Sequence, residues 1–180
     1  MPLSKGQLCA DRLIAWLNPF CERIEVAGSI RRGRPEVGDV DLVCIPRVME
    51  EMDMFGTVVN RRNLTLEEIR RRCAKEGWCG GPEGSNYVQW TAGGIQVDLW
   101  FTTPKEWTSV LLCRTGSARH NIWLAELAKA SGGHWNPHHG LRLQSGLVDA
   151  HDEAAIYSAL GVVFIPPRER DYPQFLRYLP

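Results

Sequence analysis

The sequence predicts an α/β (α+β) fold, in which a mixed β-sheet with helices over residues 1–103 is followed by a smaller α/β lobe over residues 104–180. Apolar and polar residues alternate in residues 40–44 and again in residues 95–101, as they do in half-buried strands. Elsewhere, apolar residues recur at helical spacing after capping residues, which predicts helices. A chain of 180 residues is long enough for one sizeable core or two small lobes.

The first domain begins with a helix. A capping box in residues 4–7 predicts its start, and apolar residues continue at helical spacing to Phe20. An apolar strand around residues 24–26 follows. Residues 47–63 show no clean period, so the sequence assigns no structure to them.

Further elements complete this domain. Thr65 with Glu68 forms a second capping box, and the helix that it predicts ends at Gly77. Two alternating segments, residues 86–92 and 95–101, flank a glycine turn and therefore predict a β-hairpin.

The second lobe is predicted to begin with a helix capped by Thr103, which has proline at its first position. Residues 115–117 interrupt the helical pattern and restart it, and glycines stop it at residue 132. The remaining segments are a loop at residues 134–140, a short hairpin at residues 141–148 and a helix from Asp152 to Leu160.

The composition favours an intracellular protein. The first helix is amphipathic, so it is neither a signal peptide nor a membrane span. The six cysteines include no C-x-x-C pair and are typical of reduced thiols, with a disulfide or zinc framework as the alternative. We expect a cytoplasmic or nucleoid-associated protein that is not secreted and has no membrane partner.

Three aspartates are the candidate catalytic and metal-binding residues. Asp39 and Asp41 lie two apart in a strand-like run, so both carboxylates project from the same face. Asp98 leaves the strand at residues 95–101 on the face opposite its aliphatic residues and can meet the pair over the sheet. Converging carboxylates suit two magnesium ions, which are hard cations that prefer carboxylate and phosphate oxygens.

A glycine-rich turn precedes the acidic pair. Gly28 allows a tight turn with free N–H groups, and Ser29 adds a hydroxyl donor. Arg31, Arg32 and Arg34 place guanidinium groups nearby, and guanidinium binds phosphate well. These residues predict a triphosphate site, with an ordinary solvated turn as the alternative.

Other basic and histidine clusters are less specific. Lys and Arg number 21, as do Asp and Glu, so DNA would be bound weakly and salt-sensitively through local arginine clusters such as residues 70–72. A solvated helix face explains residues 70–72 equally well. Trp135 either stacks on a base or packs in the core. Neighbouring histidines on a loop diverge more often than they chelate, so we assign no metal to His134, His138, His139 and His151.

Taken together, these motifs resemble the DNA polymerase X family, the polymerase beta-like branch of the nucleotidyltransferases. The resemblance covers most of the chain and is carried by residues 28–33, 38–41, 97–99, 115–121 and 160–170. The first three segments are common to many nucleotidyltransferases, whereas the last two favour the polymerases. The resemblance implies a nucleotidyltransferase palm in the first domain and a thumb-like nucleotide- and DNA-binding lobe in the second.

The resemblance also implies roles for particular residues. Asp39 and Asp41 would bind both magnesium ions, for which manganese can substitute, and Asp98 would bind the catalytic ion and help to deprotonate the primer 3′-hydroxyl. The incoming nucleotide would be held by two groups of residues: Gly28, Ser29, Arg32 and Gly38 at the phosphates, and Thr115, Gly116, Ser117 and Asn121 at the sugar and the nascent base pair.

The chain departs from the family pattern in three places. Cys113 and Arg114 stand where the family usually has Tyr and Phe, which bears on discrimination against ribonucleotides. Ala125 replaces a template-stacking arginine, so low fidelity is expected. The amino-terminal lyase and finger region of the family is missing, as in its small viral members, and 5′-deoxyribose phosphate lyase activity is not expected.

The expected function is that of a monomeric DNA-directed DNA polymerase acting in gap-filling repair. Its partners would be primer-template or gapped DNA and deoxynucleoside triphosphates. Two alternatives remain at this point: a template-independent nucleotidyltransferase acting on RNA, protein or a small molecule, and an inactive nucleic-acid-binding subunit.

Overall fold

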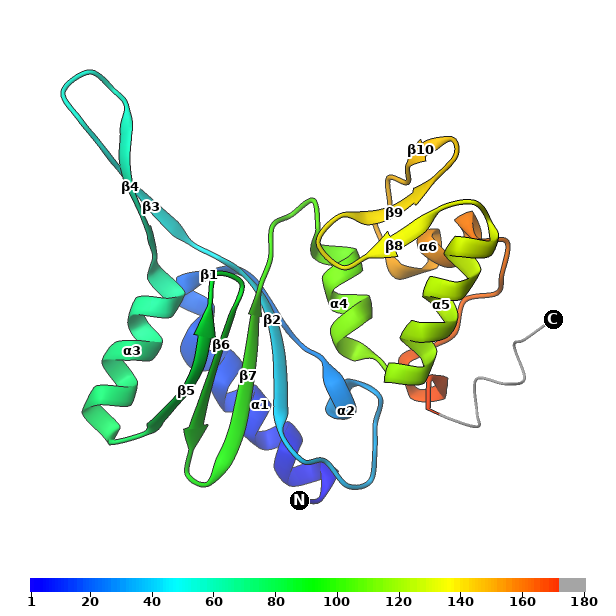
Figure 1. Ribbon diagram of the computed structural model, residues 1–180. Helices are drawn as coiled ribbons and strands as arrows, with labels where there is room; N and C mark the ends of the chain where they lie inside the picture. The colour runs from blue at the N-terminus through cyan, green and yellow to red at the C-terminus, as the bar shows by residue number, and fades with distance from the viewer. Residues whose placement is uncertain (172–180) are drawn as a thin grey trace.

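The first domain is built on a five-stranded mixed sheet in the order β1-β2-β7-β6-β5 (Figure 1). β1 (Cys21–Val26) pairs antiparallel with β2 (Val40–Pro46), and β2 pairs parallel with β7 (Ile95–Phe101). β7 is antiparallel to β6 (Tyr87–Ala92), which is antiparallel to β5 (Cys79–Gly84). The computed structural model therefore confirms a mixed sheet with helices.

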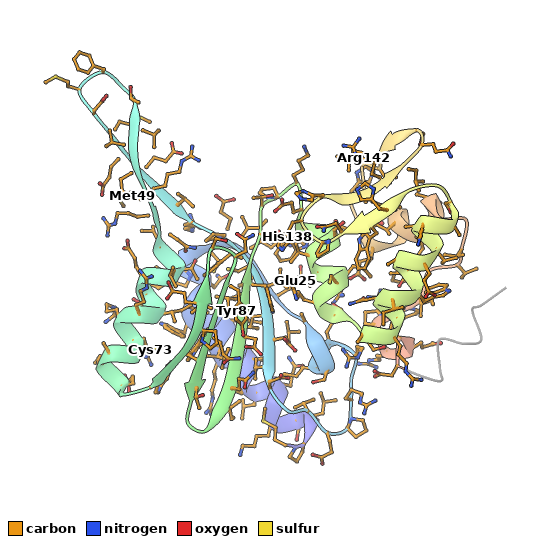
Figure 2. All side chains as sticks on the ribbon, in the orientation of Figure 1. Glu25, Met49, Cys73, Tyr87, His138 and Arg142 are labelled. Carbon is orange, nitrogen blue, oxygen red and sulfur yellow. The ribbon has the colours of Figure 1, made fainter. Side chains whose placement is uncertain are left out.

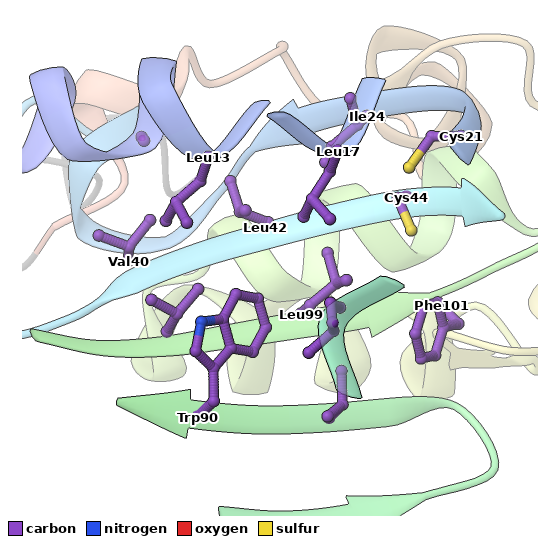
Figure 3. Packing of buried hydrophobic residues seen from close by; sticks show 14 of the residues in the cluster. Leu13, Leu17, Cys21, Ile24, Val40, Leu42, Cys44, Trp90, Leu99 and Phe101 are labelled. Atoms are coloured by element: carbon purple, nitrogen blue, oxygen red, sulfur yellow. The ribbon is translucent and has the colours of Figure 1, made fainter. Parts of the chain in front are cut away.

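One face of this sheet forms the main core. α1 (Leu3–Leu17), the short 3-10 helix η1 (Asn18–Phe20) and α3 (Leu64–Glu76) pack against it. The alternate apolar residues of β2 and β7 point into this layer because side chains of a strand alternate between its faces. The cluster, part of which is shown in Figure 3, includes Leu13, Leu17, Leu42, Trp90 and Leu99.

The opposite face of the sheet carries a smaller apolar cluster. Val43 and Ile45 of β2 pack there against Trp107, Val110 and Leu111, which belong to the first helix of the second lobe. Because the aspartates of β2 and β7 alternate with the core residues, they belong to this second face as well.

A β-hairpin projects from the far end of β2, where the sequence assigned no structure (Figure 1). It consists of β3 (Val48–Met52) and β4 (Val58–Asn63), which pair only with each other among the described strands. Asp53 Oδ1 accepts the backbone N–H groups of Phe55 and Thr57 at 2.8 and 2.9 Å and so fixes the turn. The exposed residues of both strands lack the apolar alternation that would have predicted them.

The second lobe has its own core, formed by helices and a small sheet. Residues 1–171 are described, so the last nine residues of the expected 104–180 domain lie outside the described part. Its elements are α4 (Trp107–Thr115), α5 (Ala118–Ala130), β8 (His134–Asn136), β9 (Gly140–Leu143), β10 (Gly146–Leu147), α6 (Glu153–Ala159) and a 3-10 helix, η2 (Pro167–Glu169).

The helix starts of the first domain differ from the predicted capping boxes. α1 begins directly after Pro2, and no side chain caps it, so the box at residues 4–7 is wrong. α3 is capped by Asn63, whose Oδ1 accepts a first-turn backbone N–H at 3.0 Å. Thr65, the predicted cap, instead donates its hydroxyl to a carbonyl in η1 at 2.7 Å. Tertiary partners of this kind cannot be read from a local pattern.

The second lobe confirms two predicted helix starts and corrects a third. Ser117 caps α5 and Asp152 caps α6. α4 starts four residues after the predicted cap Thr103, because residues 103–106 form a turn closed by a hydrogen bond from Glu106 N to Thr103 O at 3.1 Å.

Three smaller findings concern strands, thiols and membrane spans. β8 is a strand where a loop was expected, and β5, whose glycine-rich sequence shows no strand pattern, is a strand as well. The cysteines described by the structure, namely Cys9, Cys21, Cys44, Cys73 and Cys113, are all free. Within residues 1–171, none of the helices combines the length and the apolar character that a membrane crossing requires.

Candidate active site

The parallel pairing of β2 and β7 places two of the three aspartates side by side. Asp41 and Asp98 are direct partners in the register of these strands, and neighbouring strands lie about 4.8 Å apart. Asp39 precedes β2 by one residue and interacts electrostatically with both of the others. The three carboxylates therefore share one end of the sheet face that α4 partly covers.

Burial and crowding raise the pKa values of Asp39 and Asp41. Burial, reinforced by the charges of Asp39 and Asp98, raises the pKa of Asp41 to about 7, against the opposing effect of Arg32 and Arg114. Burial and the charge of Asp98 also raise the pKa of Asp39. A cation bound between these carboxylates would reduce the repulsion between their negative charges.

Asp98 is held by hydrogen bonds from its own sheet. Tyr87 Oη and Gln89 Nε2 donate to its Oδ1 at 2.5 and 2.8 Å, and Gln96 Nε2 donates to its Oδ2 at 2.9 Å. Tyr87, the first residue of β6, is labelled in Figure 2. Burial and the bond to Asp98 raise the pKa of Tyr87.

The carboxylates are close to one another but do not form a complete ligand set. Nowhere in residues 1–171 do three His, Cys, Asp or Glu side chains form a group arranged to hold a metal ion. The donors are carboxylate oxygens whose like negative charges repel one another, and such a set suits a hard divalent cation. Asp98 would have to exchange bonds with Tyr87 and the glutamines in order to bind one.

The turn before the acidic pair is shaped around Asp41. Gly28 has a φ of +54°, and a Cβ at this position would lie 1.8 Å from Asp41 Oδ2, so only glycine fits. The Ser29 hydroxyl oxygen is buried and has no hydrogen-bond partner among the described residues. An orphaned hydroxyl beside this turn is a donor available to an anionic ligand. A Cβ at Gly38 would have no atom within 4 Å, so packing does not require a glycine at this position.

The three neighbouring arginines have different partners. Arg31 Nη1 donates to Thr115 Oγ1 at 2.7 Å and to Glu153 Oε1 at 2.6 Å, so it joins the two domains instead of facing a ligand. Arg32 donates to the Thr115 carbonyl and, at 3.0 Å, to Asp171 Oδ1. Arg34 lies 3.6 Å from the other oxygen of Asp171.

The turn at residues 115–117 adjoins this arginine cluster. Gly116 has a φ of +72°, and a Cβ there would lie 3.2 Å from Arg32 Nη1. Ser117 donates its hydroxyl to the Arg170 carbonyl at 2.7 Å. Asn121 donates its Nδ2 to the Cys113 carbonyl at 2.8 Å, and its Oδ1 is buried with no described partner. Its amide is therefore turned toward the end of α4.

Sequence reasoning missed a stack of planar side chains beside Asp41. The Arg114 guanidinium carbon lies 3.3 Å from the centre of the Trp100 ring, whose centre is 4.2 Å from that of Tyr87. Burial lowers the pKa of Arg114, against the charges of Cys113, Asp41 and Tyr87. Alternation could have revealed part of this stack, because Trp100 follows Asp98 by two residues on the same face.

A buried ionic network connects the two domains behind this site. Glu153 accepts from Arg170 Nη2 at 2.7 Å as well as from Arg31. Next to it, His120 Nε2 and Tyr157 Oη are 2.7 Å apart, and burial together with the Arg170 charge lowers the pKa of His120 to about 3. The positions of residues 31 and 32 relative to the second lobe thus depend on buried charges.

Comparison with known proteins agrees with this architecture. Residues 110–171 match the model of the DNA polymerase beta thumb, and no curated protein matches the chain significantly. A solved structure of Leishmania infantum polymerase beta, a ternary P/T complex, is 17% identical, covers 95% of this chain and 76% of its own, and superposes with a TM-score of 0.72. The chain therefore has a polymerase beta-like fold, and its residues 110–171 are similar to the thumb of DNA polymerase beta.

Proposed function

We propose that the protein is a DNA polymerase that adds deoxynucleotides to a primer 3′-hydroxyl, with a palm in residues 1–103 and a thumb-like domain in residues 104–180. The observation that carries the proposal is the alignment of Asp41 with Asp98 in a crowded, partly buried acidic site next to the orphaned hydroxyl of Ser29. We place the reaction in short gaps of DNA inside the cell, with the protein acting as a monomer.

In this proposal each named residue binds a metal ion, holds the phosphates or accepts a proton. Asp39, Asp41 and Asp98 would hold two magnesium ions, or manganese, which supply charge stabilisation for in-line phosphoryl transfer when bound. Asp98 would accept the proton of the primer hydroxyl. The phosphates would be held by the Ser29 hydroxyl, the Arg32 guanidinium and backbone amides at Gly28 and Gly38.

The thumb-like lobe would complete the nucleotide site. The turn formed by Thr115, Gly116 and Ser117 would support the sugar of the incoming nucleotide. Asn121 would test the minor-groove edge of the new pair, where acceptors are similar for all pairs. Its amide would first have to leave the Cys113 carbonyl.

The test is primer extension by the full chain. A labelled primer on a gapped template is offered each deoxy- and ribonucleoside triphosphate with magnesium or manganese, beside the same primer without template. We expect addition of the complementary deoxynucleotide on gapped DNA. Equal addition without template would support a template-independent transferase, and no addition under any condition would support the inactive subunit.

The pKa of Asp41 makes a prediction about magnesium. Since folding raises this pKa from an ordinary 3.8 to about 7, the contribution of Asp41 to the stability of the metal-free protein is largest below about pH 3.8 and is lost progressively as the pH rises to about 7. Magnesium requires the ionised form. MgCl2 should therefore raise the melting temperature more at about 1.5 pH units above 7 than at about 1.5 units below it.

Thermal melting with and without MgCl2 at the two pH values measures this effect. Asp41→Asn, which cannot titrate, is the matched control and should lose most of the pH dependence. A magnesium-induced shift that is the same at both pH values would contradict the assignment of Asp41.

A further inference from the structure

A hollow in the second lobe is not used by the proposed reaction. It has a volume of about 590 Å³ and lies between the first turn of α4, the turn joining β8 to β9, and residues 147–150. Its lining includes none of the candidate active-site residues, because it is at the end of α4 opposite Thr115. His138 and Arg142, which line it, are labelled in Figure 2 on this side of the lobe.

Charged side chains of both signs line this hollow without neutralising one another. Lys105 and Arg142 contribute cations, and Glu106 and Asp149 contribute carboxylates. Within the described chain, none of these four groups forms an ion pair. Cations that face a shared space without carboxylate partners remain available to an anion.

The β8–β9 turn presents a histidine to the same space. Asn136 Oδ1 accepts the backbone N–H of His138 at 2.8 Å, which fixes the turn. The Nδ1 atom of His138 is buried and has no hydrogen-bond partner in the described part of the protein. Because buried polar atoms are normally satisfied, this nitrogen is a bonding position without a protein partner, and the His138 ring would have to turn for a ligand in the hollow to reach it.

We assign no metal ion to the hollow. His134, His138 and His139 line it together with two carboxylates, yet residues 1–171 contain no group of three such side chains arranged to hold a metal. The histidine loop is thus better suited to hydrogen bonding than to chelation. Ser109 and Thr108 add hydroxyls at the same wall.

We propose that this hollow binds a nucleoside monophosphate. Its phosphate would be bound by the unpaired cations Lys105 and Arg142 and by the ring nitrogen of His138 that has no protein partner. Its sugar hydroxyls or base amino group would donate hydrogen bonds to Glu106 or Asp149. Small-ligand sites typically occupy about 300–1,000 Å³, so the volume fits a ligand of this size. This site is independent of polymerase activity and separate from the nucleotide site proposed above.

The experiment is calorimetric titration of the full chain in magnesium-free buffer with adenosine 5′-monophosphate, with inorganic phosphate and adenosine as comparisons. We expect the monophosphate to bind more tightly than either comparison. Arg142→Gln should weaken its binding roughly tenfold or more, because a charged hydrogen bond is lost. Proton resonances of the histidine rings should shift on addition of the monophosphate to the wild type.

Two controls locate the ligand. Lys129→Gln removes an exposed cation from α5, and Ser29→Ala alters the candidate active site, so neither should change the affinity. Thermal melting checks that Arg142→Gln is folded. Absence of binding, unchanged affinity in Arg142→Gln, or loss of binding in Ser29→Ala would overturn the proposal.

Discussion

Replacement of Asp98 by asparagine should lower the rate of primer extension by roughly 10³-fold or more while the protein stays folded. Asparagine has nearly the same shape and keeps one acceptor oxygen for Tyr87 and Gln89, but it carries no charge and cannot take the primer proton. The loss should appear in kcat, since the substituted group acts on the reacting atoms.

Single-turnover extension of gapped DNA measures the effect, and thermal melting reports the fold. Asp11→Asn, the same change on the exposed side of α1, is the matched control and should extend primers at the wild-type rate. An Asp98→Asn protein that extends primers normally would refute the role proposed for this carboxylate.

Replacement of Glu153 by alanine should lower the free energy of unfolding by about 3–5 kcal/mol. Glu153 is the carboxylate partner of the fully buried Arg170 and of Arg31, so its removal leaves buried guanidinium charge uncompensated. The change should also weaken primer extension, because Arg31 loses one of the two bonds, those to Glu153 and Thr115, that hold the phosphate turn against the thumb-like lobe.

The same residue predicts how stability depends on pH. Burial opposes ionisation of Glu153, but the hydrogen bonds and charges of Arg170 and Arg31 outweigh it and keep its pKa below the ordinary 4.5. Its stabilising contribution is therefore complete above about pH 4.5 and is lost as the pH falls through the lowered pKa.

Urea unfolding at neutral and acidic pH tests both statements. Glu126→Ala, on the exposed side of α5, is the control and should change stability by less than about 0.5 kcal/mol. A Glu153→Ala protein as stable as that control, or one with the acid sensitivity of the wild type, would contradict the importance of the network.

The sequence predicted the parts of the fold that repeat regularly. Alternation identified β2 and β7 and placed Asp41 and Asp98 on one face, and helical spacing identified the helices that cover the sheet. The exposed β3–β4 hairpin and the glycine-rich β5 have no such period, so they were not predicted. The capping residue of α3 was misassigned because Thr65 has a tertiary partner.

The sequence motifs of the candidate site could be identified from the sequence, but the contacts of its side chains could not. The acidic residues and Ser29 lie in recognisable local patterns, whereas Arg31 is drawn away by Glu153, 122 residues later in the chain. Arg114 is likewise placed over Trp100 only by the packing of α4 on the sheet. Contacts between charged residues so far apart in the sequence can be identified only from a structure.

The β3–β4 hairpin lies in the chain between Asp41 and Asp98 but outside the sheet that aligns them. Lengthening a flexible connection costs little, about 0.6 kcal/mol for each doubling. Related proteins can thus gain or lose whole segments in the part of the chain between Asp41 and Asp98. Such insertions could carry new binding surfaces while the geometry of the acidic residues stays unchanged.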